Sequence, residues 1–164
     1  MSNPSKAHMK AAKHLIGYLT RSENFSIAYK RGRFKFSAFY DAKWGNNSDN
    51  GKSTSSHIVM LTSGPISFKV GLQSLIAQST TEVELVAAAL TMKEAVFCSN
   101  MKLELGFEKG FSSVMSYLDN TSTLQVAGNR KYSPRAKHIA LKYPFVQELV
   151  DEGKITIHHV NIQD

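Results

Sequence analysis

Three acidic residues are spaced along the chain so that they could form one site. Asp41 ends a stretch with strand periodicity, Glu84 lies near the start of a long apolar-rich segment, and Asp119 ends a short apolar stretch. If the segment of Glu84 is a helix packed beside these strands, the three side chains converge at one end of a sheet. Clustered carboxylates repel one another and are stable together only with divalent cations. The spacing therefore suggests a magnesium site, because Mg²⁺ takes oxygen ligands and retains several waters.

Each of these residues also has an ordinary structural explanation. Asp is common where a strand ends in a turn, and Glu is favoured in a first helical turn by the helix dipole. Asp119 and the following Asn120 could simply cap a helix. From spacing alone, a shared metal site and three separate structural roles remain equally good interpretations.

The first half of the chain predicts one helix and then strands. Residues 8–19 have apolar positions at helical spacing with lysines between them, and residues 34–40 alternate in the manner of a strand that ends at Asp41. Residues 26–29 are predicted as a short strand. Two further strands are expected at residues 57–62 and 66–70, joined by a tight turn at residues 63–65.

The second half predicts a long helix and a parallel crossover. Residues 79–82 (STTE) fit a capping box, and the helix is expected to bury an apolar stripe and to stop at Gly106. That stripe consists of Val83, Val86, Leu90, Phe97 and Met101. Later elements are expected as a strand at 113–118, a short helix ending near Gly128, a helix around 136–151 and a strand at 154–160. Pro144 would kink the last helix unless the helix begins there.

This order predicts a single α/β domain with a mixed sheet. Three antiparallel strands are followed by strand–helix–strand units, which pair in parallel through a crossover. We assign residues 1–32 to an N-terminal helical connection segment and residues 33–164 to the domain itself.

The composition predicts an intracellular protein that binds nucleic acid. The 164 residues are 42% hydrophobic and carry a formal net charge of +7, which is typical of a globular protein that binds a polyanion, although a merely cationic surface is the alternative. Cys98 is the only cysteine, so no internal disulfide is possible, and a buried inert thiol is expected. No apolar run approaches the roughly 20 residues that span a bilayer, and the N-terminus lacks a secretory signal.

Several motifs, in order and over nearly the whole chain, resemble the ribonuclease H domain of copia/Ty1-type LTR-retrotransposon polyproteins. Residues 40–44 (YDAKW) and 52–56 (KSTSS) are similar to "YSDADWAG…RKSTSGY", and residues 64–69 (GPISFK) to "GPISWKS". Residues 79–87 (STTEVELVA) resemble "SSTEAEYMAL". Further similarities are LDN at 118–120 to "CDN", AKHI at 136–139 to "TKHI", and NPSKAH at 3–8 to the segment that joins reverse transcriptase to ribonuclease H.

The resemblance implies a ribonuclease H-like fold and an endonuclease that cuts the RNA strand of RNA–DNA hybrids. It makes Asp41, Glu84 and Asp119 the catalytic and metal-binding residues of a two-ion Mg²⁺ site in which Mn²⁺ could substitute. Glu84 is preferred to Glu82 because the capping box already explains Glu82. The implied partners are an RNA–DNA hybrid or other nucleic acid and a reverse transcriptase domain, with no membrane and an undetermined oligomeric state.

The sequence departs from the family at a few positions. The family's fourth carboxylate lies in "ADILTK", whereas this chain stops at Asp164, which matches an earlier acidic position. We therefore expect a site without the fourth ligand, with weaker metal binding and slower turnover. Lys43 replaces the second Asp of "DADW" and is either a phosphate contact or a surface lysine.

Candidate nucleic-acid contacts surround these motifs. They are Lys43, Lys52, Ser53, Asn120, Arg130, Lys131, Arg135, Lys137 and His138. A solvated surface is an equally good explanation of the basic loop 128–137, and Ser53 could instead hydrogen-bond within its turn. Trp44 is expected to pack rather than to stack on a base, and His158 and His159 are expected to be ordinary strand residues.

Two functions remain open on the sequence. One is a magnesium-dependent ribonuclease H acting in reverse transcription. The other is a domesticated, catalytically weak ribonuclease H-like domain that binds nucleic acid or protein.

Overall fold

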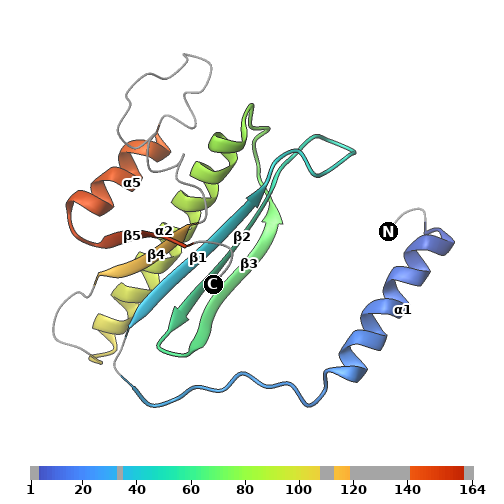
Figure 1. Cartoon of the computed structure of the whole chain (residues 1–164), viewed down its shortest axis with the longest axis horizontal. Helices are drawn as coiled ribbons and strands as arrows, with labels where there is room; N and C mark the ends of the chain where they lie inside the picture. Colours follow the sequence, from blue (N-terminus) through green and yellow to red (C-terminus); the bar gives the residue numbers. More distant parts are fainter. Residues whose placement is uncertain (1–3, 33–34, 108–112, 119–140, 161–164) are drawn as a thin grey trace.

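The structure, a computed structural model, describes residues 4–32, 35–107, 113–118 and 141–160. Within these ranges it contains a separate N-terminal helix and a five-stranded sheet packed against two helices (Figure 1). The elements in chain order are α1 (Lys6–Arg21), β1 (Phe36–Lys43), β2 (Thr54–Leu61), β3 (Gly64–Leu72), α2 (Thr80–Glu104), β4 (Val114–Leu118), α5 (Lys142–Asp151) and β5 (Ile155–His159).

The sheet is mixed, as the sequence predicts. Its strand order is β3-β2-β1-β4-β5, with antiparallel pairing of β1 with β2 and of β2 with β3. The pairs β1–β4 and β4–β5 are parallel. Consequently β1, β3, β4 and β5 all point the same way, and their C-terminal residues lie at the same end of the sheet.

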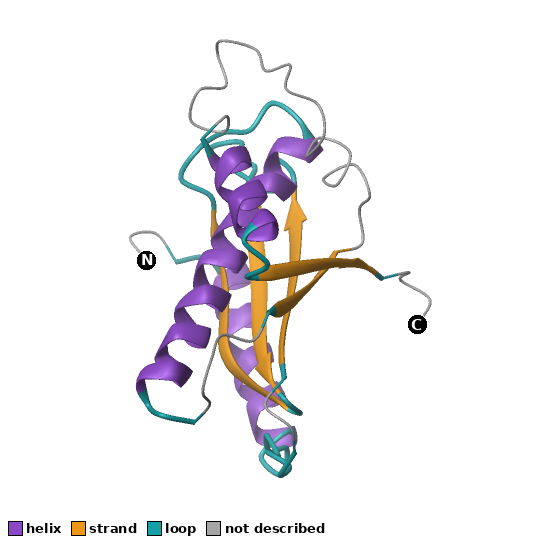
Figure 2. Ribbon diagram, turned by 90° about the vertical axis from the view of Figure 1, so that its left-hand side faces the viewer, coloured by secondary structure: helices purple, strands orange, loops and turns teal. Residues whose placement is uncertain are grey.

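The hydrophobic core lies between one face of this sheet and the helices α2 and α5 (Figures 1 and 2). Phe36 and Ala38 of β1 pack with Ala88 and Met92 of α2, and all four are almost completely buried. Small alanines along α2 let the helix approach the strands closely, and α5 adds Tyr143, Val146 and Leu149 at helical spacing.

The opposite face of the sheet is not covered by any described helix. Alternation along the strands turns Phe39, Phe68 and Val70 to this side, and all three are exposed. This open face also carries the side chain of Asp41, two residues after Phe39 on the same strand.

The buried stripe of α2 differs from the predicted one. Val83 and Val86 are buried as expected, but Leu90, Phe97 and Met101 are exposed. The inward residues include Leu85, Ala88, Met92, Ala95 and Ser99. Counting only large apolar residues was misleading, because alanines and a serine occupy the contact with the sheet.

The strand predicted at residues 26–29 is wrong. Residues 24–32 have no regular secondary structure, and Phe25 and Ile27 are exposed. The segment is instead held by side-chain bonds, in which Tyr29 Oη donates to Pro65 O at 2.6 Å and Lys30 N donates to Ser63 Oγ at 3.0 Å. Each of these bonds involves a side chain, so they do not build the backbone ladder that would make the segment a strand.

The start of α5 explains why Pro144 does not kink this helix. α5 begins at Lys142, so Pro144 falls in its first turn, where its missing N–H would have no helical partner and causes no kink.

α1 has no buried residue, and Figure 1 shows it apart from the sheet. None of the helices among the described residues is long and apolar enough to cross a membrane.

Cys98 is half-buried rather than fully buried. Burial, with a smaller contribution from the negative charge of Glu94, raises the pKa of its thiol, so the thiolate that would make it reactive is disfavoured.

Candidate active site

The elements that carry the predicted carboxylates meet at one end of the sheet. The register aligns Lys43, the last residue of β1, with Thr54 of β2 and Leu72 of β3. The strands β1 and β3, on either side of β2, therefore finish at the same end of the sheet, and the chain then leads into α2. On the other side of β1, Phe39 pairs with Tyr117, one residue before the end of β4. These strands therefore end, and α2 begins, at the same end of the sheet. The convergence of the three carboxylates stays a prediction, because Asp119 lies outside the described residues.

Asp41 is exposed near the C-terminal end of β1. Its Oδ1 accepts a hydrogen bond from the N–H of Ala42 at 2.8 Å, and its cross-strand partner is Ser56. A shallow hollow of about 260 Å³ adjoins it on the sheet, lined by Phe39, Tyr40, Asp41, Ser56, His57 and Ile58. The carboxylate is therefore accessible to a large ligand on the open face.

Glu84 is half-buried in the first turns of α2 between the buried Val83 and Leu85. Glu82 has a different role, because its Oε2 accepts the N–H of Gln78 at 2.7 Å while Ser79 Oγ accepts the N–H of Glu82 at 3.2 Å. The predicted N-cap at Ser79 is confirmed, although the return bond reaches Gln78 instead of Ser79. The capping role of Glu82 supports the choice of Glu84 as the metal-binding candidate.

Asp41 and Glu84 belong to different layers of the fold. The side chain of Asp41 lies on the open face, whereas α2 packs on the face of Phe36 and Ala38. A site shared by the two carboxylates must therefore form at the end of the sheet, where β1 finishes and α2 begins. Among the described residues, no three His, Cys, Asp or Glu side chains are grouped closely enough to hold a metal ion.

Two side chains connect the strands to the start of α2. Trp44, which follows β1 directly, donates its indole N–H to Ala77 O at 3.0 Å. Gln73 is only 4% exposed and donates Nε2 to both Ser55 Oγ (2.6 Å) and Val83 O (2.9 Å). Nothing in the sequence pattern singles out Gln73, because a lone glutamine after a strand has no distinctive spacing.

The candidate nucleic-acid contacts fall into three groups. Lys43 is exposed at the end of β1, and Lys52 is half-buried in the turn before β2. Ser53 is 0% exposed and its Oγ accepts the N–H of Gly45 at 3.0 Å, so the expected phosphate contact is corrected to the turn hydrogen bond. Asn120, Arg130, Lys131, Arg135, Lys137 and His138 lie outside the described residues.

A row of rings extends across the open face from β1. Phe39 and Tyr117 stack with centroids 4.8 Å apart, and His158 of β5 lies 5.5 Å from Tyr117. Because Phe39 and Asp41 share a face of the same strand, the row begins on the face that carries the candidate carboxylate.

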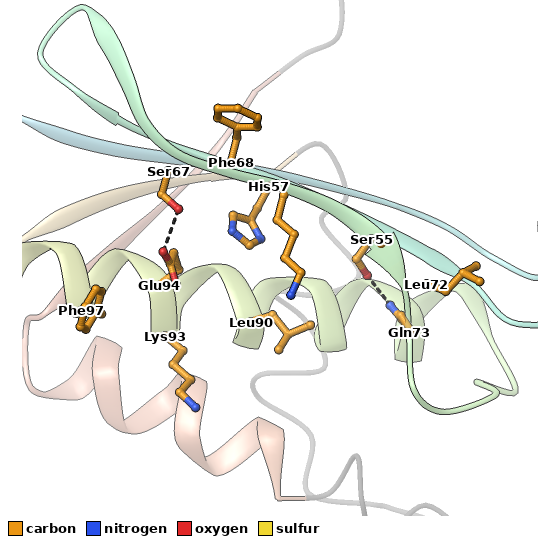
Figure 3. Close-up of a pocket in the computed structure, with 12 residues that line it drawn as sticks. Ser55, His57, Ser67, Phe68, Leu72, Gln73, Leu90, Lys93, Glu94 and Phe97 are labelled. Atoms are coloured by element: carbon orange, nitrogen blue, oxygen red, sulfur yellow. Dashed lines mark hydrogen bonds between the residues drawn. The ribbon is translucent and has the colours of Figure 1, made fainter. Parts of the chain in front are cut away.

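A second hollow of about 510 Å³ lies on the other side of the sheet, between β2, β3 and α2 (Figure 3). Ser67 Oγ donates to Glu94 Oε1 at 2.7 Å across it, and His57 points into the space between sheet and helix. Burial lowers the pKa of His57; Glu94 opposes this shift and Lys69 adds to it. No local pattern in the sequence indicates this hollow, since its residues come from segments far apart along the chain.

The sequence is similar to retrotransposon polyproteins over its full length. It is 32% identical over 165 residues to the retrovirus-related Pol polyprotein from transposon RE1 of Arabidopsis thaliana and 28% identical over 164 residues to that from transposon TNT 1-94 of Nicotiana tabacum. The chain spans only 11% and 12% of these relatives. It is also 30% identical over 97 residues to the secreted RxLR effector protein 161 of Plasmopara viticola, covering 58% of this chain and 68% of the effector. No protein-family model matches the chain.

The fold matches solved ribonucleases H at low sequence identity. The LC11 ribonuclease H1 isolated from compost superposes with a TM-score of 0.55 at 8% identity, covering 79% of this chain and 86% of that enzyme. The ribonuclease H1 of Halobacterium salinarum gives 0.50 at 10% identity, covering 79% and 87%. A foamy viral protease-reverse transcriptase solved with double-stranded DNA gives 0.53 at 14% identity, covering 98% of this chain and 30% of that protein.

Proposed function

Because this chain belongs to the copia-type retrovirus-related Pol polyproteins and has the ribonuclease H fold, we propose that it hydrolyses the RNA strand of RNA–DNA hybrids with the help of divalent cations. The observation that carries this proposal is the meeting of β1, β4 and the start of α2 at one end of the sheet. Asp41 and Glu84 stand on two of these elements, and Asp119 follows the third in the sequence.

The donor set suits magnesium. Asp41 and Glu84 offer carboxylate oxygens, which are the ligands that Mg²⁺ prefers, and with Asp119 they would hold the ions while waters and substrate phosphate complete the coordination. The bound ions would supply an activated water and stabilise the leaving oxygen.

The protein's own residues would place the scissile phosphate. The accessible carboxylate of Asp41 and the exposed Lys43 would bracket it on the open face. A water oxygen bonds to phosphorus and gives up a proton, the bond from phosphorus to the 3′-oxygen breaks, and that oxygen takes up a proton. The products are a 3′-hydroxyl and a 5′-phosphate.

Recognition of the hybrid would depend on its shape and not on its sequence. Phosphate contacts position a nucleic acid without reading its bases, and 2′-hydroxyls across the minor groove distinguish RNA from DNA. The formal charge of +7 supports this kind of binding. A reverse transcriptase domain is the partner we propose, because the match to the viral protease-reverse transcriptase includes nearly the whole chain.

Cleavage of an end-labelled RNA–DNA hybrid tests the proposal. The wild-type chain should cut the RNA strand with Mg²⁺ or Mn²⁺ and not with EDTA, and Asp41→Asn and Asp119→Asn should each lower the rate at least 100-fold. Asp49→Asn is the matched control, since Asp49 is exposed in the turn after β1 and lies outside the candidate site. A folded wild-type protein that cuts with neither metal would refute the enzymatic function.

The second candidate is a ribonuclease H-like binding domain without significant catalysis. The similarity to the secreted RxLR effector favours this candidate. The chain covers 68% of that protein, and its name describes no polyprotein. In that case the hybrid or another partner would bind equally well to wild type and Asp41→Asn, and neither would cut.

A further inference from the structure

Gln73 joins the strand pair of Asp41 to the helical turn of Glu84. Its Nε2 donates to Ser55 Oγ at 2.6 Å and to Val83 O at 2.9 Å (the first bond is drawn in Figure 3). Ser55 pairs with Ala42, the neighbour of Asp41, and Val83 immediately precedes Glu84. One amide group therefore spans the two elements at the positions next to both candidate ligands.

The burial of Gln73 indicates that this connection is rigid. The side chain is 4% exposed, and its backbone N–H donates to Ser53 O at 2.8 Å, which fixes the residue at both ends. Its Oε1 is buried and has no hydrogen-bond partner among the residues that the structure describes, which is costly. A side chain that keeps two bonds of its N–H₂ group at that cost is restricted to one orientation.

Trp44 makes a second, independent connection, between the end of β1 and the segment that precedes α2. It lies three residues after Asp41, and its indole N–H donates to Ala77 O at 3.0 Å, in the segment that leads into α2. About half of the Trp44 side chain is exposed, so this hydrogen bond does not depend on burial of the ring in the core.

From these two connections we infer that Gln73 and Trp44 are positioning residues that set the spacing between the carboxylates of Asp41 and Glu84. The inference rests on the proposed function. Two-ion catalysis needs the metals about 4 Å apart, so the ligands on β1 and α2 must be held closely. Residues that orient metal ligands typically change metal affinity by about 10-fold to 100-fold when they are lost.

The test is a Mn²⁺ titration of the purified chain, followed by water-proton relaxation and independent of any cleavage. Gln73→Met retains the volume and loses both donated bonds. Trp44→Phe retains a six-membered aromatic ring and loses the indole N–H together with the rest of the five-membered ring. Each variant should bind Mn²⁺ at least 10-fold more weakly than wild type, and its cleavage rate should recover as Mn²⁺ is raised.

Two controls separate positioning from general stability. Gln78→Met changes an exposed glutamine close to the start of α2, and Tyr29→Phe deletes the bond to Pro65 at the opposite end of the sheet. Both should leave the Mn²⁺ midpoint unchanged, even where the unfolding midpoint falls.

The outcomes distinguish the inference from the function beneath it. Wild-type Mn²⁺ affinity in both Gln73→Met and Trp44→Phe would overturn the positioning role and leave the proposed function intact. Failure of the wild-type chain itself to bind Mn²⁺ would overturn both.

Discussion

Glu82 and Glu84 are two residues apart and have different environments. The carboxylate of Glu82 accepts the N–H of Gln78 and belongs to the cap of α2, whereas Glu84 lies half-buried between two core residues. The sequence alone could distinguish them only through the capping pattern and a family resemblance. The hydrogen bonds give that choice a physical basis.

Substitution of each glutamate should therefore have a different effect. Glu84→Gln should lower hybrid cleavage at least 100-fold. Glu82→Gln should retain near-wild-type cleavage, because an amide oxygen can still accept the bond from Gln78, and should cost at most about 1 kcal/mol of stability. Cleavage rates and denaturant unfolding of both variants would check this, and a larger catalytic loss in Glu82→Gln would reverse the assignment.

His57 should make the stability depend on pH in mildly acidic solution. Because burial lowers its pKa in the folded state below 6.5, the unfolded chain binds the proton more tightly. Stability is therefore fully present above about pH 6.5, decreases as the pH falls toward the lowered folded-state pKa, and loses nothing further from this group below it.

The variant His57→Gln isolates that contribution. Denaturant midpoints measured at pH 7.5 and 5.5 should fall less in His57→Gln than in wild type, because the other titrating groups are common to both. If the denaturant midpoint fell by the same amount between the two pH values in both proteins, His57 would not contribute to the pH dependence of stability.

At the scale of elements, the start of α2 is where local sequence and candidate site coincide. Ser79 Oγ caps the helix by accepting the N–H of Glu82. The helix begins at the end of the sheet where both β1 and β3 finish. This cap was predictable because it depends on four consecutive residues. The inward face of α2 was not, because it is decided by which residues the sheet accommodates.

Removal of the cap should weaken the protein without abolishing its fold. Ser79→Ala should cost about 0.5–2 kcal/mol, since the N–H of Glu82 loses its acceptor. Denaturant unfolding would measure this, with Ser74→Ala as the control at an exposed serine just before the helix. A stability unchanged by Ser79→Ala would mean that water replaces the cap without cost.

On the scale of the whole molecule, charge should dominate binding to a hybrid. The logarithm of the binding constant should fall linearly with the logarithm of the salt concentration, with a slope of roughly −0.9 per phosphate contact. Lys43→Gln, at the end of β1, should make this slope shallower by about 1. Anisotropy titrations between about 50 and 200 mM salt would measure it.

Lys154→Gln provides the matched control for the salt experiment. Lys154 pairs with Glu152 at 2.7 Å just before β5, at the opposite end of the sheet from Asp41. The variant loses the same charge and should keep the wild-type slope. If both variants change the slope equally, the loss reflects net charge and not a contact at the candidate site.

The sequence by itself determined the types and order of most of the described elements. Strand alternation, the cap at Ser79 and the order of β1, β2, β3, α2 and β4 all depend on neighbours within a few residues, and together they required a mixed sheet whose strands end near the candidate carboxylates. These properties are local, so a single chain read from end to end contains them.

Only the tertiary structure decided which residues meet across the fold. It turned Leu90, Phe97 and Met101 outward, buried Ser53 in a turn, left residues 26–29 without a partner strand, and placed Gln73 between Ser55 and Val83. Each of these facts depends on what packs against a segment from elsewhere in the chain. Such contacts are set by the packing of whole layers, and no local pattern of residues specifies them.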